Sequence, residues 1–219
     1  GSVTMLHQPT PRTDLAVWAE DTVRVLTMIG ARLVLLGPPF EDLSAMLQEN
    51  SIAHRHLAEL AGSGAAPLAG PVDVPEDATA LLQLTSGSTA EPKAVRITHA
   101  NLHANLLAMV EAAELDAERD VAVSWLPLFH DMGMVGCLTV PMAIGMSAVK
   151  VTPADFLARP LLWPELITKH RGTVTAAPNF AYAIVGRRLA RADDGEFDLS
   201  SVRIALNGAE PIDPAAVRT

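Results

Sequence analysis

Ten consecutive residues hold the densest group of side chains that could do chemistry. The stretch 84–93, LTSGSTAEPK, follows an apolar segment and supplies four hydroxyls, a glycine and a lysine, namely Thr85, Ser86, Gly87, Ser88, Thr89 and Lys93. Hydroxyls and backbone N–H groups donate to phosphate oxygens, Gly87 lets the main chain come close, and Lys93 adds positive charge. The P-loop spacing GxxxxGK[ST] is missing. The stretch predicts a polyphosphate-binding loop, although a Ser/Thr-rich turn between strands would use the same residues.

A histidine and an aspartate stand side by side where a predicted strand breaks at Pro127. The sequence there is SWLPLFHDMGM, and the pair is His130 and Asp131. Such a pair is typical of general base catalysis. The spacing alone favours a structural role, in which Asp131 caps the following helix and His130 closes a polar contact.

Two more predicted strands end in segments where α/β sheets bind ligands. One continues into Pro178, Asn179 and Phe180, and packing in the core explains Phe180 and the nearby Tyr182 equally well. The other turns at Gly208, in the run Asn207, Gly208, Ala209 and Glu210. An ordinary strand-to-helix turn is the alternative for this second segment.

Together these segments resemble a known family. TSGSTAEPK is similar to the phosphate-binding signature of the adenylate-forming superfamily, which includes acyl-CoA synthetases, fatty acyl-AMP ligases, luciferases and peptide-synthetase adenylation domains. Ala90 and Ala94 stand where many members have glycine, which leaves every hydroxyl in place. LPLFHDMG resembles the LPxFHD(M/I)G motif of fatty acyl-AMP ligases and related fatty acyl-CoA synthetases. Four such segments occur in family order between about residues 84 and 212.

The resemblance implies a role for each segment. ATP phosphates would bind Thr85, Ser86, Gly87, Ser88, Thr89 and Lys93, and adenine would bind Asn207, Gly208, Ala209 and Glu210. Lys93 and His130 would be the catalytic residues, with His130 a gate or positioning residue and not a proton shuttle. The acyl pocket would be lined by His130, Met132, Gly133, Met134, Gly136, Pro178, Asn179 and Phe180. Simple helix packing explains residues 132–136 equally well.

The implied reaction turns a fatty acid and ATP into an acyl-adenylate and pyrophosphate, with ATP and Mg²⁺ as cofactors. The acyl group would pass to an acyl carrier protein of a polyketide or peptide synthase, or to coenzyme A. An amino-acid adenylation domain and a non-catalytic nucleotide-binding scaffold are the alternatives. The family's metal, ribose and catalytic-lysine segments lie further along than Ile212, so no metal ligand is expected in this chain and we expect it to be an inactive portion.

Hydrophobic periodicity predicts the elements that position these residues. Helices are expected over residues 14–29, 41–49, 99–115, 131–144, 161–170 and 180–190. Strands are expected over 32–36, 80–84, 94–97, 121–126, 148–151, 173–176 and 202–206. Their alternation predicts an α/β fold with layered, mostly parallel sheets flanked by helices.

A Pro/Gly-rich stretch, residues 61–77, predicts a boundary between two parts. We expect a partial α/β subdomain over residues 3–75 and a truncated ATP- and acyl-binding subdomain over 76–219, without the C-terminal lid domain. Residues 1–2, Gly-Ser, are typical of a cloning scar.

Composition excludes several classes of protein. A net charge of −9 argues against binding to nucleic acid or anionic lipid. The sequence has no run of about 18 apolar residues, so it predicts no membrane-spanning helix. The single cysteine, Cys137, excludes an internal disulfide, favours a buried structural thiol over a nucleophile, and fits the reducing cytoplasm. Because aromatic residues make up only 4%, we expect a core of Leu, Val, Ile, Ala and Met.

Overall fold

A computed structural model describes residues 1–9, 13–62, 64, 66, 69–85 and 93–214 of the chain. The chain divides into two compact units, and each is described by itself. The first unit contains Gly1–Met5, Glu76–Gln83 and Arg96–Thr219, and the second contains Leu6–Pro75 and Leu84–Val95. Each unit has its own cluster of buried apolar side chains.

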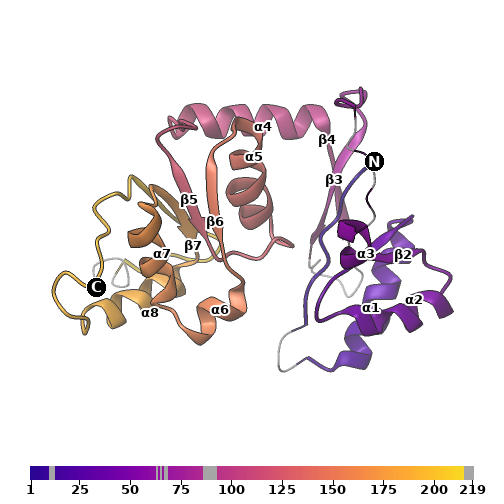
Figure 1. Ribbon diagram of the computed structural model, residues 1–219, viewed down its shortest axis with the longest axis horizontal. Helices are drawn as coiled ribbons and strands as arrows, with labels where there is room; N and C mark the ends of the chain where they lie inside the picture. The colour runs from indigo at the N-terminus through magenta and orange to yellow at the C-terminus, as the bar shows by residue number, and fades with distance from the viewer. Residues whose placement is uncertain (10–12, 63, 65, 67–68, 86–92, 215–219) are drawn as a thin grey trace. The chain divides into compact units, whose positions relative to one another are not determined.

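A four-stranded sheet forms the centre of the first unit (Figure 1). Its strands are β5 (Val121–Ser124), β6 (Ser147–Lys150), β7 (Val174–Ala177) and β8 (Ile204–Asn207), in the spatial order β6-β5-β7-β8. Every neighbouring pair in this sheet is parallel. The predicted α/β fold with parallel strands is confirmed, and each of these four strands overlaps a predicted one.

Helices cover both sides of this sheet. A π-helix (Met132–Thr139) and α5 (Val140–Ile144) connect β5 to β6, α6 (Pro153–Ala158) and α7 (Leu162–His170) connect β6 to β7, and α8 (Asn179–Leu189) connects β7 to β8. The connection from β5 to β6 moves toward one edge of the sheet, whereas the connections from β6 to β7 and from β7 to β8 move toward the other edge. Right-handed crossovers therefore place α5 on the opposite side from α7 and α8, as Figure 1 shows.

The helix predicted over residues 131–144 is confirmed, but the sequence did not predict that eight residues in its first part adopt the wider π form. The sequence also did not predict α6. Its Thr152 forms a capping box with Asp155, and Pro153 occupies the first turn, so the local start signal was present in the sequence.

Aromatic side chains form the middle of this unit's core. The Trp125 ring stacks on Phe156, with 4.0 Å between centroids and 6° between planes. Trp163 meets both rings edge-on, at 6.2 and 6.0 Å. Most of the buried residues of this unit are Val, Leu, Ile or Ala, as expected. The sequence did not predict that the buried aromatic residues gather at one place.

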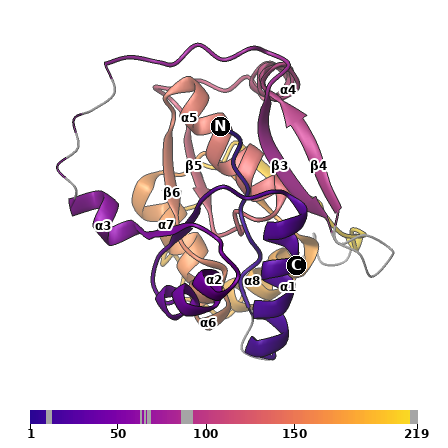
Figure 2. The same cartoon turned by 90° about the vertical axis from the view of Figure 1, so that its right-hand side faces the viewer.

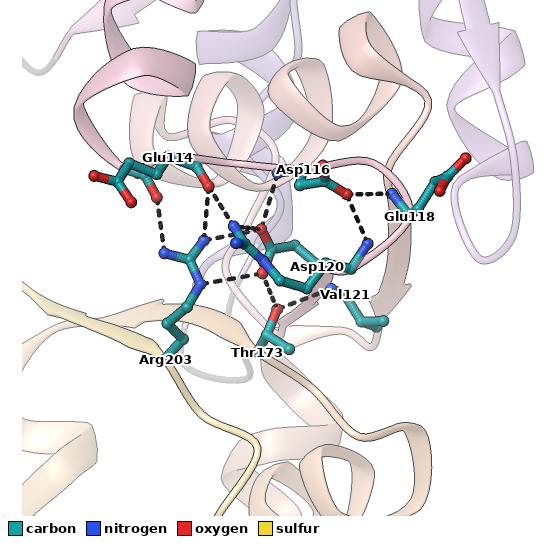
Figure 3. A network of polar contacts seen from close by, with 9 residues as sticks. Glu114, Asp116, Glu118, Asp120, Val121, Thr173 and Arg203 are labelled. Carbon is teal, nitrogen blue, oxygen red and sulfur yellow. Dashed lines mark hydrogen bonds and ion pairs between the residues drawn. The ribbon is translucent and has the colours of Figure 1, made fainter.

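A polar network closes the amino-terminal end of the sheet (Figure 3). The Asp120 side chain, fully buried, accepts hydrogen bonds from Arg203 Nη2 at 2.8 Å and Arg119 Nη2 at 2.9 Å. It also accepts from Thr173 Oγ1 at 2.8 Å and from the backbone N–H of Asp116 at 2.9 Å. These partners place the pKa of Asp120 well below its ordinary value, although burial opposes that shift. The network joins the segments that enter β5, β7 and β8.

The second unit is smaller. It contains α1 (Leu15–Met28), β1 (Val34–Leu36), a 3₁₀ turn (Glu41–Leu43), α2 (Ser44–Glu49), β2 (His54–His56) and α3 (Leu57–Gly62). Strands β1 and β2 pair in parallel over a core of Leu26, Val34, Leu36 and Leu47. The sequence did not predict β2 and α3, whereas the predicted helix 41–49 begins as the 3₁₀ turn and continues as α2.

Strands β3 (Thr79–Thr85) and β4 (Lys93–Thr98) form a two-stranded sheet (Figure 2), and α4 (His99–Ala112) follows. Val3 extends this sheet, because its N–H donates to Ala80 O at 3.0 Å and its carbonyl accepts from Leu82 N at 2.9 Å. Among the helices described, none has the length and apolar character needed to cross a membrane.

Candidate functional site

Three of the predicted segments lie at one edge of the four-stranded sheet. Because β5, β7 and β8 are parallel, their carboxyl ends meet at the same edge. His130 follows β5, Asn179 follows β7, and Asn207 ends β8. The register pairs Ala177 with Asn207, so the last two segments leave the sheet side by side.

The two described ends of the predicted phosphate loop, Thr85 and Lys93, belong to the second unit. Thr85 ends β3 and Lys93 begins β4, and both side chains are exposed. The residues between them, which include Ser86, Gly87, Ser88 and Thr89, lie outside the described residues.

His130 and Asp131 form an exposed pair with 2.6 Å between His130 Nδ1 and Asp131 Oδ1. The same carboxylate oxygen accepts from the backbone N–H of Met132 at 2.7 Å, so Asp131 caps the π-helix. This confirms the structural role that the spacing favours. With Nδ1–H donating to the carboxylate, Nε2 is the nitrogen left to meet a ligand.

The two glycines of the π-helix, Gly133 and Gly136, lie in different environments. A Cβ added to Gly133 would lie 2.1 Å from the carbonyl oxygen of Pro127, so the backbone approaches here as only glycine allows. A Cβ on Gly136 would meet nothing within 4 Å. Met132 packs against the core, whereas Met134 is half-buried.

Cys137 lies in the same helix and is buried, as predicted. Burial raises the pKa of its thiol. The neutral thiol is therefore favoured, which suits a packing role.

The start of α8 carries the proposed acyl-pocket residues Pro178, Asn179 and Phe180. Asn179 is buried, whereas Phe180 is 39% exposed and its ring lies 6.1 Å from that of Trp125. Tyr182, one turn on, packs edge-on against Trp163 at 5.3 Å. The core interpretation thus suits Tyr182, while Phe180 keeps an exposed face.

The segment after β8 differs from expectation in its turn. Gly208 keeps an ordinary φ, and the left-handed residue is Ala209, with φ of +70°. The prediction of a turn made by Gly208 is wrong, because the strained conformation falls on the next residue. Such a φ is uncommon for a non-glycine residue and is often associated with functional sites.

Asn207 carries a buried acceptor that fits a ligand. Its Nδ2 donates to Asn179 Oδ1 at 3.1 Å, whereas its Oδ1 is buried and has no partner among the described residues. An unpaired buried acceptor is costly, and the 6-amino group of adenine is a donor of the required kind. The residues therefore fit the adenine of ATP. Within the described parts of the chain, no three His, Cys, Asp or Glu side chains gather into a metal site.

Comparison with known proteins identifies the family of the chain. Residues 12–219 match the family described as AMP-binding enzyme. The chain belongs to this family. A protein of Mycobacterium tuberculosis, Rv1013, whose name designates it a ligase, is 57% identical over 217 residues, or 99% of this chain and 39% of that protein.

Other relatives match over about two thirds of the chain. A medium-chain-fatty-acid–[acyl-carrier-protein] ligase from Teredinibacter turnerae is 40% identical over 69% of this chain and 23% of that protein. A long-chain-fatty-acid–AMP ligase from Mycobacterium marinum is 45% identical over 64% of this chain and 23% of that protein. The chain thus spans only 23% to 39% of the length of these relatives.

Solved structures are also similar. One is a fatty acyl-adenylate ligase from L. pneumophila in complex with acyl adenylate and pyrophosphate, with 31% identity and a TM-score of 0.74 over 90% of this chain and 34% of that one. A structure from a study of E. coli and L. pneumophila fatty acyl-adenylate ligases gives 36% identity and a TM-score of 0.81, over 93% and 37%. The resemblance inferred from the motifs is confirmed.

Proposed function

We propose that the protein activates a fatty acid with ATP, forming a fatty acyl-adenylate and pyrophosphate. The observation that carries the proposal is the set of three segments at the carboxyl edge of one parallel sheet, marked by His130, Asn179 and Asn207. Relatives named as fatty-acid ligases share 40% to 45% identity with this chain, over 64% to 69% of its length.

The proposed step is a displacement at phosphorus. A carboxylate oxygen of the acid bonds to the α-phosphorus. The bond between the α-phosphorus and the oxygen that bridges it to the β-phosphate breaks, and pyrophosphate leaves without proton transfer. Lys93 and the hydroxyls of residues 85–89 would stabilise charge on the phosphates. His130, exposed at the sheet edge, would orient the acid through Nε2.

ATP supplies the adenylate, and we propose that its adenine lies against the backbone and small side chains of the segment Asn207, Gly208, Ala209 and Glu210. Magnesium would neutralise the phosphate oxygens. The proposed acyl pocket consists of the residues at the starts of the π-helix and α8: His130, Met132, Gly133, Met134, Gly136, Pro178, Asn179 and Phe180. Gly136 is the member whose Cα faces open space.

The acyl acceptor that we propose is an acyl carrier protein, with coenzyme A as the alternative. Two of the fatty-acid relatives are named as acyl-carrier-protein ligases.

We also propose that the chain divides into a partial subdomain over residues 3–75 and an ATP- and acyl-binding subdomain over residues 76–219, and that the protein is cytoplasmic. The 219-residue chain alone would not turn over, because it spans 23% to 39% of its relatives.

Pyrophosphate release tests the proposal. The 219-residue chain and the full-length polypeptide that carries it are incubated with ATP and fatty acids, or with amino acids. Fatty-acid-dependent release by the full-length polypeptide alone is expected. Release with amino acids only would favour an amino-acid adenylation domain, and brisk turnover by the short chain would refute its proposed inactivity.

A further inference from the structure

Glu210 does not project freely from the proposed adenine segment. Its Oε1 accepts a hydrogen bond from the backbone N–H of Phe180 at 2.6 Å, across 30 residues of sequence. Phe180 is the second residue of α8, and its N–H is one of the donors that a helix leaves without an internal partner. Pro178 at the N-cap makes no side-chain capping bond. A carboxylate also suits the positive end of the helix dipole, so Glu210 caps α8 from a distant segment.

Three further hydrogen bonds join the end of β8 to its neighbours, two of them to α8 and one to the last residue of β7. Asn207 Nδ2 donates to Asn179 Oδ1 at 3.1 Å, Tyr182 Oη donates to Leu206 O at 2.7 Å, and Gly208 N donates to Ala177 O at 3.2 Å. The end of β8 is therefore held both to the first turn of α8 and to the end of β7, from which α8 follows.

Ala209 gives Glu210 its direction. The chain turns through its left-handed φ of +70°, immediately before Glu210. That conformation is unfavourable for a residue with a Cβ. Ala209 thus lies between Asn207, whose buried Oδ1 has no partner in the described parts of the chain, and Glu210, whose carboxylate caps α8.

We infer that Glu210 is a positioning residue that couples the nucleotide side of the site to the acyl side. By holding the backbone of Phe180, it sets the ring that lies 6.1 Å from Trp125 and the neighbouring Asn179. The bond is exposed at both ends, so it fixes geometry more than it stabilises the fold. This inference rests on the proposed function, because it assigns Phe180 and Asn179 to the acyl pocket.

Glu196 provides a matched control in the same unit. Its Oε2 also accepts from a backbone N–H, that of Asp193 at 3.3 Å, in an exposed loop. Glu196→Ala removes the same kind of bond without touching α8. Glu210→Ala removes the cap, and Glu210→Gln keeps an oxygen acceptor without the charge.

Amide hydrogen exchange on the 219-residue chain tests the cap. In Glu210→Ala the Phe180 N–H should exchange about tenfold faster, while Glu210→Gln and Glu196→Ala leave it within about threefold of the original chain. An unchanged Phe180 rate in Glu210→Ala would overturn the cap.

Kinetics of the full-length polypeptide test the coupling. Glu210→Ala should raise KM for the fatty acid about tenfold and leave KM for ATP within about threefold, with Glu210→Gln restoring most of the loss. Equal rises in both KM values would show a direct nucleotide contact, and a result like that of Glu196→Ala would show no coupling; either overturns the inference. If the unsubstituted polypeptide forms no fatty acyl-adenylate, the proposed function itself fails and the coupling with it, whatever the exchange result.

Discussion

Removing the charge of Asp120 should destabilise the first unit more than any exposed ion pair would. The carboxylate is fully buried and contacts two arginines and Thr173 at 2.8 to 2.9 Å. In Asp120→Asn the amide NH₂ would face those donors, and both arginines would lose their counter-charge. Breaking a buried pair by removing one partner typically costs about 3 to 5 kcal/mol. We expect a loss of about 3 kcal/mol in the free energy of unfolding at pH 7, because both arginines also reach solvent.

Urea denaturation followed by tryptophan fluorescence measures this loss. With a slope of about 2 to 3 kcal/mol per M, the midpoint should fall by about 1 M. Glu165→Gln is the control, since its pair with Arg159 is exposed at 48% and 61% and should change the free energy by less than about 1 kcal/mol.

The charge also gives a pH signature. Because the folded pKa of Asp120 is depressed, its contribution is present above the ordinary value near 4 and is lost as the pH falls toward the folded pKa. The difference between the original chain and Asp120→Asn should stay constant from pH 5 to 8 and shrink by about 1 kcal/mol at pH 3. A loss below about 1 kcal/mol at pH 7, or a difference that does not change at pH 3, would refute the reasoning.

Three other predictions follow from single residues. Gly133→Ala should destabilise by about 1 to 3 kcal/mol because its Cβ would meet Pro127 O, whereas Gly136→Ala, in open space, should be neutral or stabilising in the same urea assay. Tyr182 is the chain's one tyrosine, and burial raises its pKa to about 12. The absorbance at 295 nm should therefore titrate with a midpoint near 12 in the folded chain and near 10 in guanidinium. A midpoint near 10 in the folded chain would contradict the burial of this side chain. The stability linked to Tyr182 should be lost as pH rises above about 10, and Tyr182→Phe should remove that dependence. Lys93→Ala should weaken ATP binding in calorimetry by about 1 to 3 kcal/mol with a loss of activity in the full-length polypeptide, and unchanged binding would favour a scaffold.

Local sequence patterns were enough to predict most of the elements that carry the site. The residues of β5, β7 and β8 are short apolar runs between helical periods, and the parallel sheet follows from that alternation. Elements of three to six residues, such as β2 and α3, are too short for their hydrophobic repeat to be recognised, so they were not predicted. The π form of residues 132–139 was not predicted. These residues are almost all apolar, so their hydrophobic pattern does not distinguish one helical period from another.

The site was predicted as segments but not as connections between them. The motif residues His130, Asn179 and Asn207 lie where parallel strand ends must meet. Their partners are set by tertiary geometry, as when Glu210 reaches the N–H of Phe180 and when Ala209 takes the left-handed conformation that Gly208 would have been expected to take. No pattern within either segment specifies the other.

Fatty-acid-dependent formation of acyl-adenylate by the full-length polypeptide tests fatty-acid activation most directly. The polypeptide is incubated with ATP, Mg²⁺ and fatty acids of several chain lengths, and products are identified by mass spectrometry beside parallel reactions with amino acids. We expect fatty acyl-AMP and an equal amount of pyrophosphate, with both lost together in His130→Ala. Adenylates of amino acids alone, or ATP binding without any adenylate, would contradict the assignment of His130, Phe180 and Asn207 to a fatty-acid-activating site.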